Sequence, residues 1–142
     1  MTMKILYQTS ATATGGRTGT ATVDDGSLTL SLTTPKELGG TGGDGTNPEQ
    51  LFASGYAACF LSALRFIAGR HKQTLSEESS VTVSVGIGPR ADGAGFCLDV
   101  ALNASLPGLD TKMATRLVEE AHATCPYSHL TREGTDVRLT VS

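Results

Sequence analysis

The chain has 142 residues, a formal net charge of −3 and no tryptophan, and aromatic residues make up 5% of it. Its basic residues are scattered rather than gathered into a patch, which excludes the electrostatic footprint of a nucleic-acid-binding domain. This length favours a single domain over residues 1–142, large enough to bury a core without disulfide bonds.

The first third of the chain predicts antiparallel strands joined by tight turns. Short stretches rich in Thr, Ser and Val alternate polar and apolar residues, and an Asp-Gly pair, a strong hairpin signal, lies between two of them. The expected strands cover residues 4–14, 17–23 and 27–33.

A glycine-rich loop follows at residues 38–45. The glycines at 40, 42 and 45 match the dinucleotide-binding fingerprint by spacing, but the next helix begins only after the last of them. No acidic residue stands about 20 positions further on, where that motif needs a ribose ligand. We therefore interpret residues 39–45 as a mobile loop or lid.

The sequence Asn47-Pro48-Glu49 is a strong helix start, with an N-cap, a proline in the first position and an acidic residue in the first turn. From there to about Arg70 apolar residues occur on almost every side, which predicts a central buried helix. Its length would suit a membrane span, but small polar residues and an arginine interrupt it, so we favour the core helix and no membrane insertion.

The second half of the chain predicts a hairpin, a second helix and a final strand. Alternating residues mark strands at 81–87 and 96–102, a helix follows Asp110 and ends at Pro126, and a last strand covers 136–141. This order of elements indicates an α+β fold rather than a doubly wound parallel sheet. The N-terminal segment lacks the apolar stretch of a signal peptide, so we expect a cytoplasmic protein, in which structural disulfides are rare.

Two cysteines stand in contrasting contexts. Cys59 lies within the apolar helix, where a free cysteine commonly packs as a small hydrophobe, and Cys125 precedes Pro126 at a helix end, where we expect it to be exposed. A reactive pair would need Cα atoms within about 7 Å, which only tertiary folding can provide. Two inert thiols remain the alternative, and Cys97 in the expected strand is interpreted as incidental.

The residues around these cysteines are also compatible with other functions. His122, Cys125 and His129 could ligate a metal, although the paired spacings of common zinc sites are missing. A histidine-assisted cysteine nucleophile for acyl transfer and a non-enzymatic module that binds apolar ligands are further alternatives. If Cys59 is reactive, it needs a nearby cation, and Arg17 held by a carboxylate such as Glu49 would suit, although both could be ordinary surface charges.

Several motifs carry a family resemblance over nearly the whole chain. They are Ala13-Thr-Gly-Gly-Arg17, Thr46-Asn-Pro-Glu-Gln-Leu-Phe52, Gly55-Tyr-Ala-Ala-Cys-Phe60 and Ala121-His-Ala-Thr-Cys-Pro-Tyr-Ser128. With them the sequence resembles the organic hydroperoxide resistance (Ohr) branch of the Ohr/OsmC peroxidases. The resemblance implies an OsmC-like fold in which antiparallel sheets wrap around central helices, as an intertwined homodimer with active sites at the subunit interface.

The resemblance also implies roles for individual residues. Cys59 would be the peroxidatic thiol, Cys125 the resolving thiol, and Arg17 with Glu49 the pair that activates Cys59. The implied substrates are alkyl and fatty-acid hydroperoxides, reduced without cofactor or metal, and the implied reductant is a dihydrolipoyl group on a lipoylated protein. Neither nucleic acid nor membrane insertion is implied.

Helix geometry adds one expectation about this site. Glu49 precedes Cys59 by ten residues, which on one straight helix is a rise of about 15 Å. The two side chains cannot meet along such a helix. We therefore expect either a kink near Ser54 and Gly55 or, in preference, an Arg17–Glu49 pair that reaches Cys59 of a partner chain.

Overall fold

The computed structural model describes residues 3–142. The chain forms two compact units, Met1–Leu51 and Phe52–Ser142, which are described separately below. Residues 1 and 2, which the expected single domain includes, lie outside the described residues. The expectation of one domain over residues 1–142 stays a prediction.

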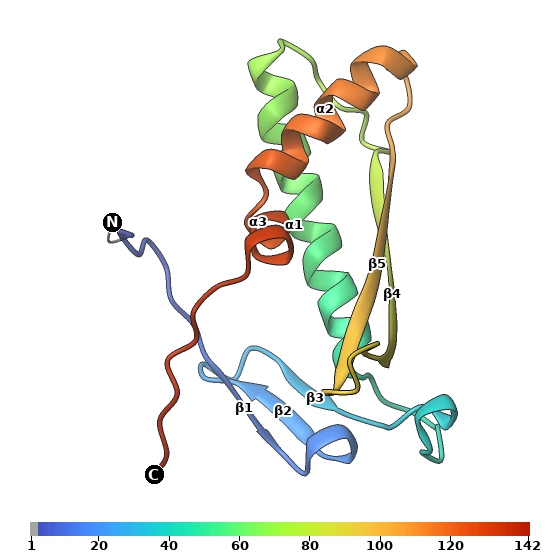
Figure 1. The fold of residues 1–142 in the computed structure, drawn as a ribbon. Helices are drawn as coiled ribbons and strands as arrows, with labels where there is room; N and C mark the ends of the chain where they lie inside the picture. Colours follow the sequence, from blue (N-terminus) through green and yellow to red (C-terminus); the bar gives the residue numbers. More distant parts are fainter. Residues whose placement is uncertain (1–2) are drawn as a thin grey trace. The chain divides into compact units, whose positions relative to one another are not determined.

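The first unit contains a three-stranded antiparallel sheet in the order β1-β2-β3, drawn in blue in Figure 1. Its elements are β1 (Ala11–Thr14), the 3-10 turn η1 (Gly16–Thr18), β2 (Thr20–Val23), β3 (Thr29–Ser31) and the 3-10 turn η2 (Lys36–Leu38). The three strands were predicted, but all are shorter than expected. Ala11 pairs with Val23, the last residue of β2 before its turn. Residues 4–10 lie exposed beyond the strand, where Ser10 accepts one further hydrogen bond of 2.9 Å from the N–H of Asp24.

Helix α1 (Pro48–Arg70) begins in the first unit and continues in the second. The Oδ1 atom of Asn47 accepts a hydrogen bond of 2.8 Å from the backbone N–H of Gln50, which confirms the predicted N-cap. The helix passes through Ser54 and Gly55 without a break in its helical geometry.

The second unit adds a long hairpin and two shorter helices to α1 (Figure 1). They are β4 (Ser80–Pro89), β5 (Phe96–Ser105), α2 (Thr111–Thr124) and α3 (Pro126–Glu133). The predicted hairpin and second helix are confirmed, and Asp110 caps α2 by accepting a hydrogen bond of 2.8 Å from the N–H of Met113. The two antiparallel sheets and three helices confirm the predicted α+β class.

The core of the second unit lies where α1 meets α2. Phe60 and Leu64 of α1 and Leu117 of α2 are fully buried there, and residues of β4 and β5 pack against this cluster. Among the described residues, α1 is the one helix long and apolar enough to cross a membrane, by length and composition alone. Its packing in the core agrees with the predicted buried helix.

Two expectations for the C-terminal region are wrong. Pro126 does not simply end α2, because it also occupies the first position of α3, a helix that was not predicted. The expected strand at 136–141 is absent: these residues extend beyond α3 outside the β4–β5 sheet, with Val137, Leu139 and Val141 exposed (Figure 1). A strand requires partners for its backbone groups, and none is recorded for this segment among the described residues.

Candidate functional site

Cys59 and Cys125 come together in the second unit. Cys59 lies on α1 and Cys125 at the junction of α2 and α3, and the Cys125 thiol points at the Cys59 sulfur with an Sγ–Sγ distance of 3.7 Å. Both thiols are free. Sequence spacing alone left this proximity open, and the fold of the second unit provides it.

The burial of the two thiols is the reverse of the expectation. Cys125 is completely buried, whereas Cys59 is half-buried. The expected exposure of Cys125 assumed that the chain leaves the core at Pro126. Instead α3 begins there, and the Tyr127 and Ser128 side chains return to α1, where Ser128 is fully buried.

The backbone holds Cys125 firmly between its two helices. Its φ and ψ are −63° and 128°, the extended geometry that a following proline enforces. Its N–H donates to the carbonyl of Ala121 at 2.8 Å, and its own carbonyl accepts from the N–H of His129 at 2.9 Å. Cys125 thus closes α2 and opens α3, which fixes where its side chain starts.

The surroundings of Cys59 within this unit disfavour its thiolate. Burial is the main reason that the pKa of Cys59 is raised above its ordinary value, and the neighbouring Cys125 thiol adds to the rise. A hydrogen bond from the backbone N–H of Tyr127, in the first turn of α3, acts in the opposite direction but does not reverse it. A reactive Cys59 at neutral pH therefore needs a nearby positive charge, and no cation of the described residues is among the groups that shift its pKa.

A hydrogen-bonded chain of three side chains connects the helices that carry or adjoin the two thiols. The hydroxyls of Tyr56 and Ser128 share a buried hydrogen bond of 2.6 Å, and the Ser128 Oγ shares another of 2.9 Å with Nδ1 of His122. Sequence reasoning missed this chain. One signal was available, because Tyr56 stands three residues before Cys59 on α1, and residues three apart on a helix share a face.

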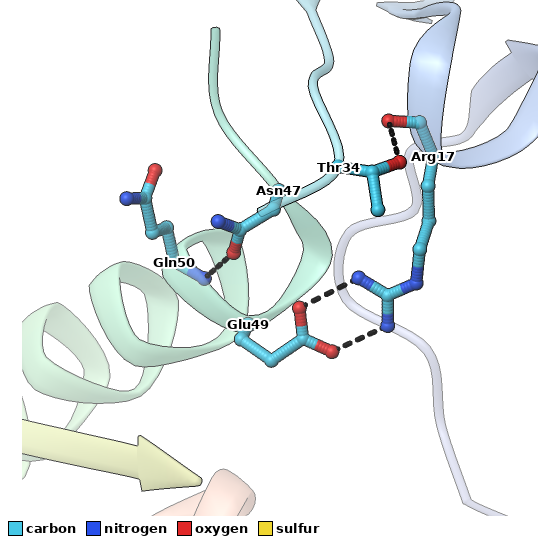
Figure 2. Close-up of polar contacts among 5 residues, drawn as sticks. All are labelled: Arg17, Thr34, Asn47, Glu49 and Gln50. Carbon is cyan, nitrogen blue, oxygen red and sulfur yellow. Dashed lines mark hydrogen bonds and ion pairs between the residues drawn. The ribbon is translucent and has the colours of Figure 1, made fainter. Parts of the chain in front are cut away.

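Arg17 and Glu49 form a bidentate ion pair in the first unit (Figure 2). The guanidinium Nη1 and Nη2 donate to the two carboxylate oxygens at 2.8 and 2.5 Å. This pairing raises the pKa of Arg17 and holds the pKa of Glu49 below its usual range, in each case chiefly through the hydrogen bonds. The arginine side chain remains 34% exposed, so its cationic head is accessible to a further anion.

Local geometry explains why Arg17 is placed there. The Thr34 hydroxyl donates to the Arg17 carbonyl at 3.3 Å, as Figure 2 shows, and Arg17 itself lies in the η1 turn. A Cβ atom on Gly19 would lie 1.7 Å from the Thr14 carbonyl oxygen, so the chain can close this turn only with glycine at that position.

The four predicted catalytic residues thus form two pairs, one within each unit. Cys97 is exposed on β5 and belongs to neither pair. The alternative metal site is not supported: Nδ1 of His122 bonds to Ser128, and no cluster of three His, Cys, Asp or Glu side chains suited to a metal occurs within residues 3–142.

A pocket of about 580 Å³ opens in the second unit beside the core helix. Apolar side chains of α1, α2 and β5 form most of its wall, and one of them, Phe60, follows Cys59 in the sequence. The full set is Phe52, Tyr56, Phe60, Leu98, Val100, Leu102, Val118, His122 and Thr131. Such a lining suits an apolar ligand with few polar groups.

Comparison with known proteins gives consistent matches. A family model described as OsmC-like protein matches residues 40–140. The organic hydroperoxide resistance protein of Xanthomonas axonopodis pv. citri is 50% identical over 139 residues, which is 98% of this chain and 96% of the relative.

Solved structures agree with these matches. An organic hydroperoxide resistance protein from Legionella pneumophila has a TM-score of 0.85 at 50% identity, over 98% of this chain and 99% of that chain. One from Vibrio cholerae, with captopril bound in one of its active sites, has a TM-score of 0.86 at 48% identity, over 96% and 92%.

Proposed function

Because the chain belongs to the OsmC-like protein family and is 50% identical to the organic hydroperoxide resistance protein of Xanthomonas axonopodis pv. citri, we propose that it is a thiol peroxidase that reduces organic hydroperoxides. The family and the structural matches confirm the resemblance noted in the sequence and the OsmC-like fold. One observation carries the enzymatic proposal: two free thiols, 66 residues apart in sequence, lie with their sulfurs 3.7 Å apart.

The proposed reaction uses the two thiols in turn. The Cys59 thiolate attacks the distal oxygen of the hydroperoxide, the O–O bond breaks, and the alkoxide leaves and takes up a proton to become the alcohol. Cys59 is thereby oxidised to a sulfenic acid. The Cys125 thiol then attacks that sulfur, its proton leaves with the hydroxyl group as water, and a Cys59–Cys125 disulfide forms.

Arg17 is proposed to stabilise the thiolate and the charge that develops on the peroxide oxygens, with Glu49 orienting its guanidinium. The raised pKa of Cys59 supports the need for such a cation. Ten residues of continuous α1 separate Glu49 from Cys59, a rise of about 15 Å. We therefore propose that the site is completed in a homodimer, where the Arg17–Glu49 pair of one chain serves Cys59 of the other.

The substrate and the reductant follow from the same chemistry. The apolar pocket next to Phe60 supports alkyl and fatty-acid hydroperoxides as substrates, with no resident cofactor. We propose a protein-bound dihydrolipoyl group as the reductant, which restores both thiols by exchange through a mixed disulfide. A thiol pair that cycles in this way suits a reducing cytoplasm.

The decisive experiment treats the reduced protein with one equivalent of tert-butyl hydroperoxide and maps cysteine oxidation by mass spectrometry. We expect a Cys59–Cys125 disulfide, an unmodified Cys97 and one equivalent of tert-butanol. Cys125→Ser should give sulfenic acid at Cys59, and sulfinic acid once a second equivalent of peroxide is added, whereas Cys59→Ser should leave the peroxide unconsumed. Thiols that stay reduced in the wild type would contradict the peroxidase and favour the alternative of a module that binds apolar ligands in the pocket.

A further inference from the structure

A hydrogen-bonded chain of three side chains connects the helices that carry the two thiols. It runs from Tyr56 on α1 through Ser128 on α3 to His122 on α2, with distances of 2.6 and 2.9 Å. Tyr56 and Ser128 are buried, with 3% and 0% of their surface exposed, and His122 lies at the surface end. The chain therefore reaches from the solvent into the core beside Cys125.

The positions of these residues relative to the cysteines are regular. Tyr56 precedes Cys59 by three residues, His122 precedes Cys125 by three, and Ser128 follows Cys125 by three. Residues three apart on a helix lie on the same face, so Tyr56 stands next to Cys59 on α1, while His122 and Ser128 lie just before and just after the α2–α3 junction that carries Cys125. The network thus ties α1 to both helices that meet at Cys125.

Disulfide formation places a demand on this region. The sulfurs must close from 3.7 Å to about 2.05 Å, and the bond tolerates only a narrow range of Cβ positions. The backbone of Cys125 is already fixed by its bonds to Ala121 and His129, but these bonds lie within α2 and α3 and do not fix either helix against α1. The Tyr56–Ser128 bond does so, and a hydroxyl buried without its partner is costly.

We propose that Tyr56, Ser128 and His122 are positioning residues for the resolving step, which hold the Cys125 thiol in line for attack on the oxidised Cys59. The proposal rests on the peroxidase function proposed above and adds to it three residues that act on its second step. Tyr56 and His122 also lie in the wall of the apolar pocket, whereas Ser128 does not, so Ser128→Ala is the variant that isolates this step. Cys59 oxidation needs the thiolate and a cation. Closure of the disulfide needs in addition that α1 and the α2–α3 junction hold the two sulfurs at a fixed relative position.

The test separates the two steps in the full-length protein. Reduced protein is mixed rapidly with tert-butyl hydroperoxide, quenched at set times, and analysed for dimedone-trapped sulfenic acid, disulfide and sulfinic acid. Tyr56→Phe removes one hydroxyl without changing shape and should slow disulfide formation about fivefold, and Ser128→Ala about tenfold. The rate of Cys59 oxidation should stay within about twofold in Ser128→Ala, because this hydroxyl lies outside the pocket lining and takes no part in that step.

A longer-lived sulfenic acid gives a second readout. Under excess peroxide the share of Cys59 that reaches sulfinic acid should rise by the same factor as resolution slows, because the two reactions compete for one intermediate. Asparagine places a polar atom where Nδ1 of histidine lies, and glutamine places one nearer Nε2. His122→Asn should therefore keep the wild-type resolving rate, and His122→Gln should lose about threefold.

Thr124→Val is the matched control, since it removes a hydroxyl next to Cys125 whose hydrogen bond, donated to the Glu120 carbonyl, stays within α2. Urea unfolding of every variant measures stability in parallel. Resolving rates in Tyr56→Phe and Ser128→Ala equal to that of Thr124→Val would overturn the proposal, and so would equal slowing of both steps together with lost stability. A wild type that forms no Cys59–Cys125 disulfide would instead refute the peroxidase function itself.

Discussion

The contact between Gly55 and Tyr127 allows a quantitative prediction. Gly55 lies inside α1, where replacement by alanine normally stabilises a helix by about 1 kcal/mol. Here a Cβ atom would lie 2.9 Å from the Tyr127 phenol oxygen and 3.4 Å from Cε2 and Cζ of the ring. Overpacking of this kind costs about 1–3 kcal/mol. We therefore expect Gly55→Ala to lower the free energy of unfolding by about 1 kcal/mol, since the clash outweighs the gain in helix propensity.

Tyr127→Phe removes the atom responsible for the closest approach and leaves the 3.4 Å ring contacts. In that background Gly55→Ala should stabilise the protein by about 0.5 kcal/mol, so the double-mutant cycle should give a coupling of about 1.5 kcal/mol. Urea denaturation of the four proteins at one protein concentration measures this coupling. Equal effects of Gly55→Ala in both backgrounds would refute the reasoning, because the phenol oxygen would then not decide the outcome.

Three further predictions concern charge and capping. Arg17 lowers the pKa of Glu49, so this carboxylate stabilises the folded protein above its unfolded pKa of about 4.3 and loses that contribution as the pH falls below this value. The urea midpoint of Glu49→Gln should therefore vary less than that of the wild type between about pH 5 and about pH 3, where carboxylates titrate. Arg17→Leu should raise the pH midpoint of Cys59 alkylation by iodoacetamide, and an unchanged midpoint would show that Arg17 does not reach the thiol. Asp110→Ala removes the N-cap of α2 and should lower the free energy of unfolding, measured in urea, by about 1 kcal/mol. Asp110→Asn should lower it by only about 0.3 kcal/mol, because asparagine is also a good N-cap.

Local signals in the sequence predicted the start of α1 and most of the second unit. Asn47 with Pro48, Asp110, and the alternation through β4 and β5 each act over a few residues, and the structure follows them closely. They express backbone preferences that hold in any surroundings. The class of the fold could therefore be predicted without knowledge of its packing.

The predictions that proved wrong concern features that tertiary contacts determine. Pro126 has two local meanings, the end of one helix and the start of another, and only the packing of Ser128 against Tyr56 shows that both apply here. That packing also buries Cys125, which sequence context alone had suggested to be exposed. The expected strand at 136–141 has the right alternation but no partner among the described residues, and alternation cannot supply one.

The candidate site also has one part that the sequence predicted and one that it did not. Its four residues were identified through family motifs, and the ion pair of Arg17 with Glu49 has the fork geometry anticipated for it. The spacing of Tyr56 from Cys59 marks it as a neighbour of that thiol, but its hydrogen bond to Ser128 could not be predicted, since the two residues are 72 positions apart and meet only in the folded second unit.

The proximity of Cys59 and Cys125 also has a mechanical consequence. A disulfide between them would close a loop of 66 residues that includes β4, β5 and all of α2. In the chain-entropy model a crosslink over a loop of that length disfavours the unfolded chain by about 4 kcal/mol. The proposed peroxidase would therefore become harder to unfold, and to proteolyse, each time it is oxidised, and its melting temperature would report the redox state of its surroundings.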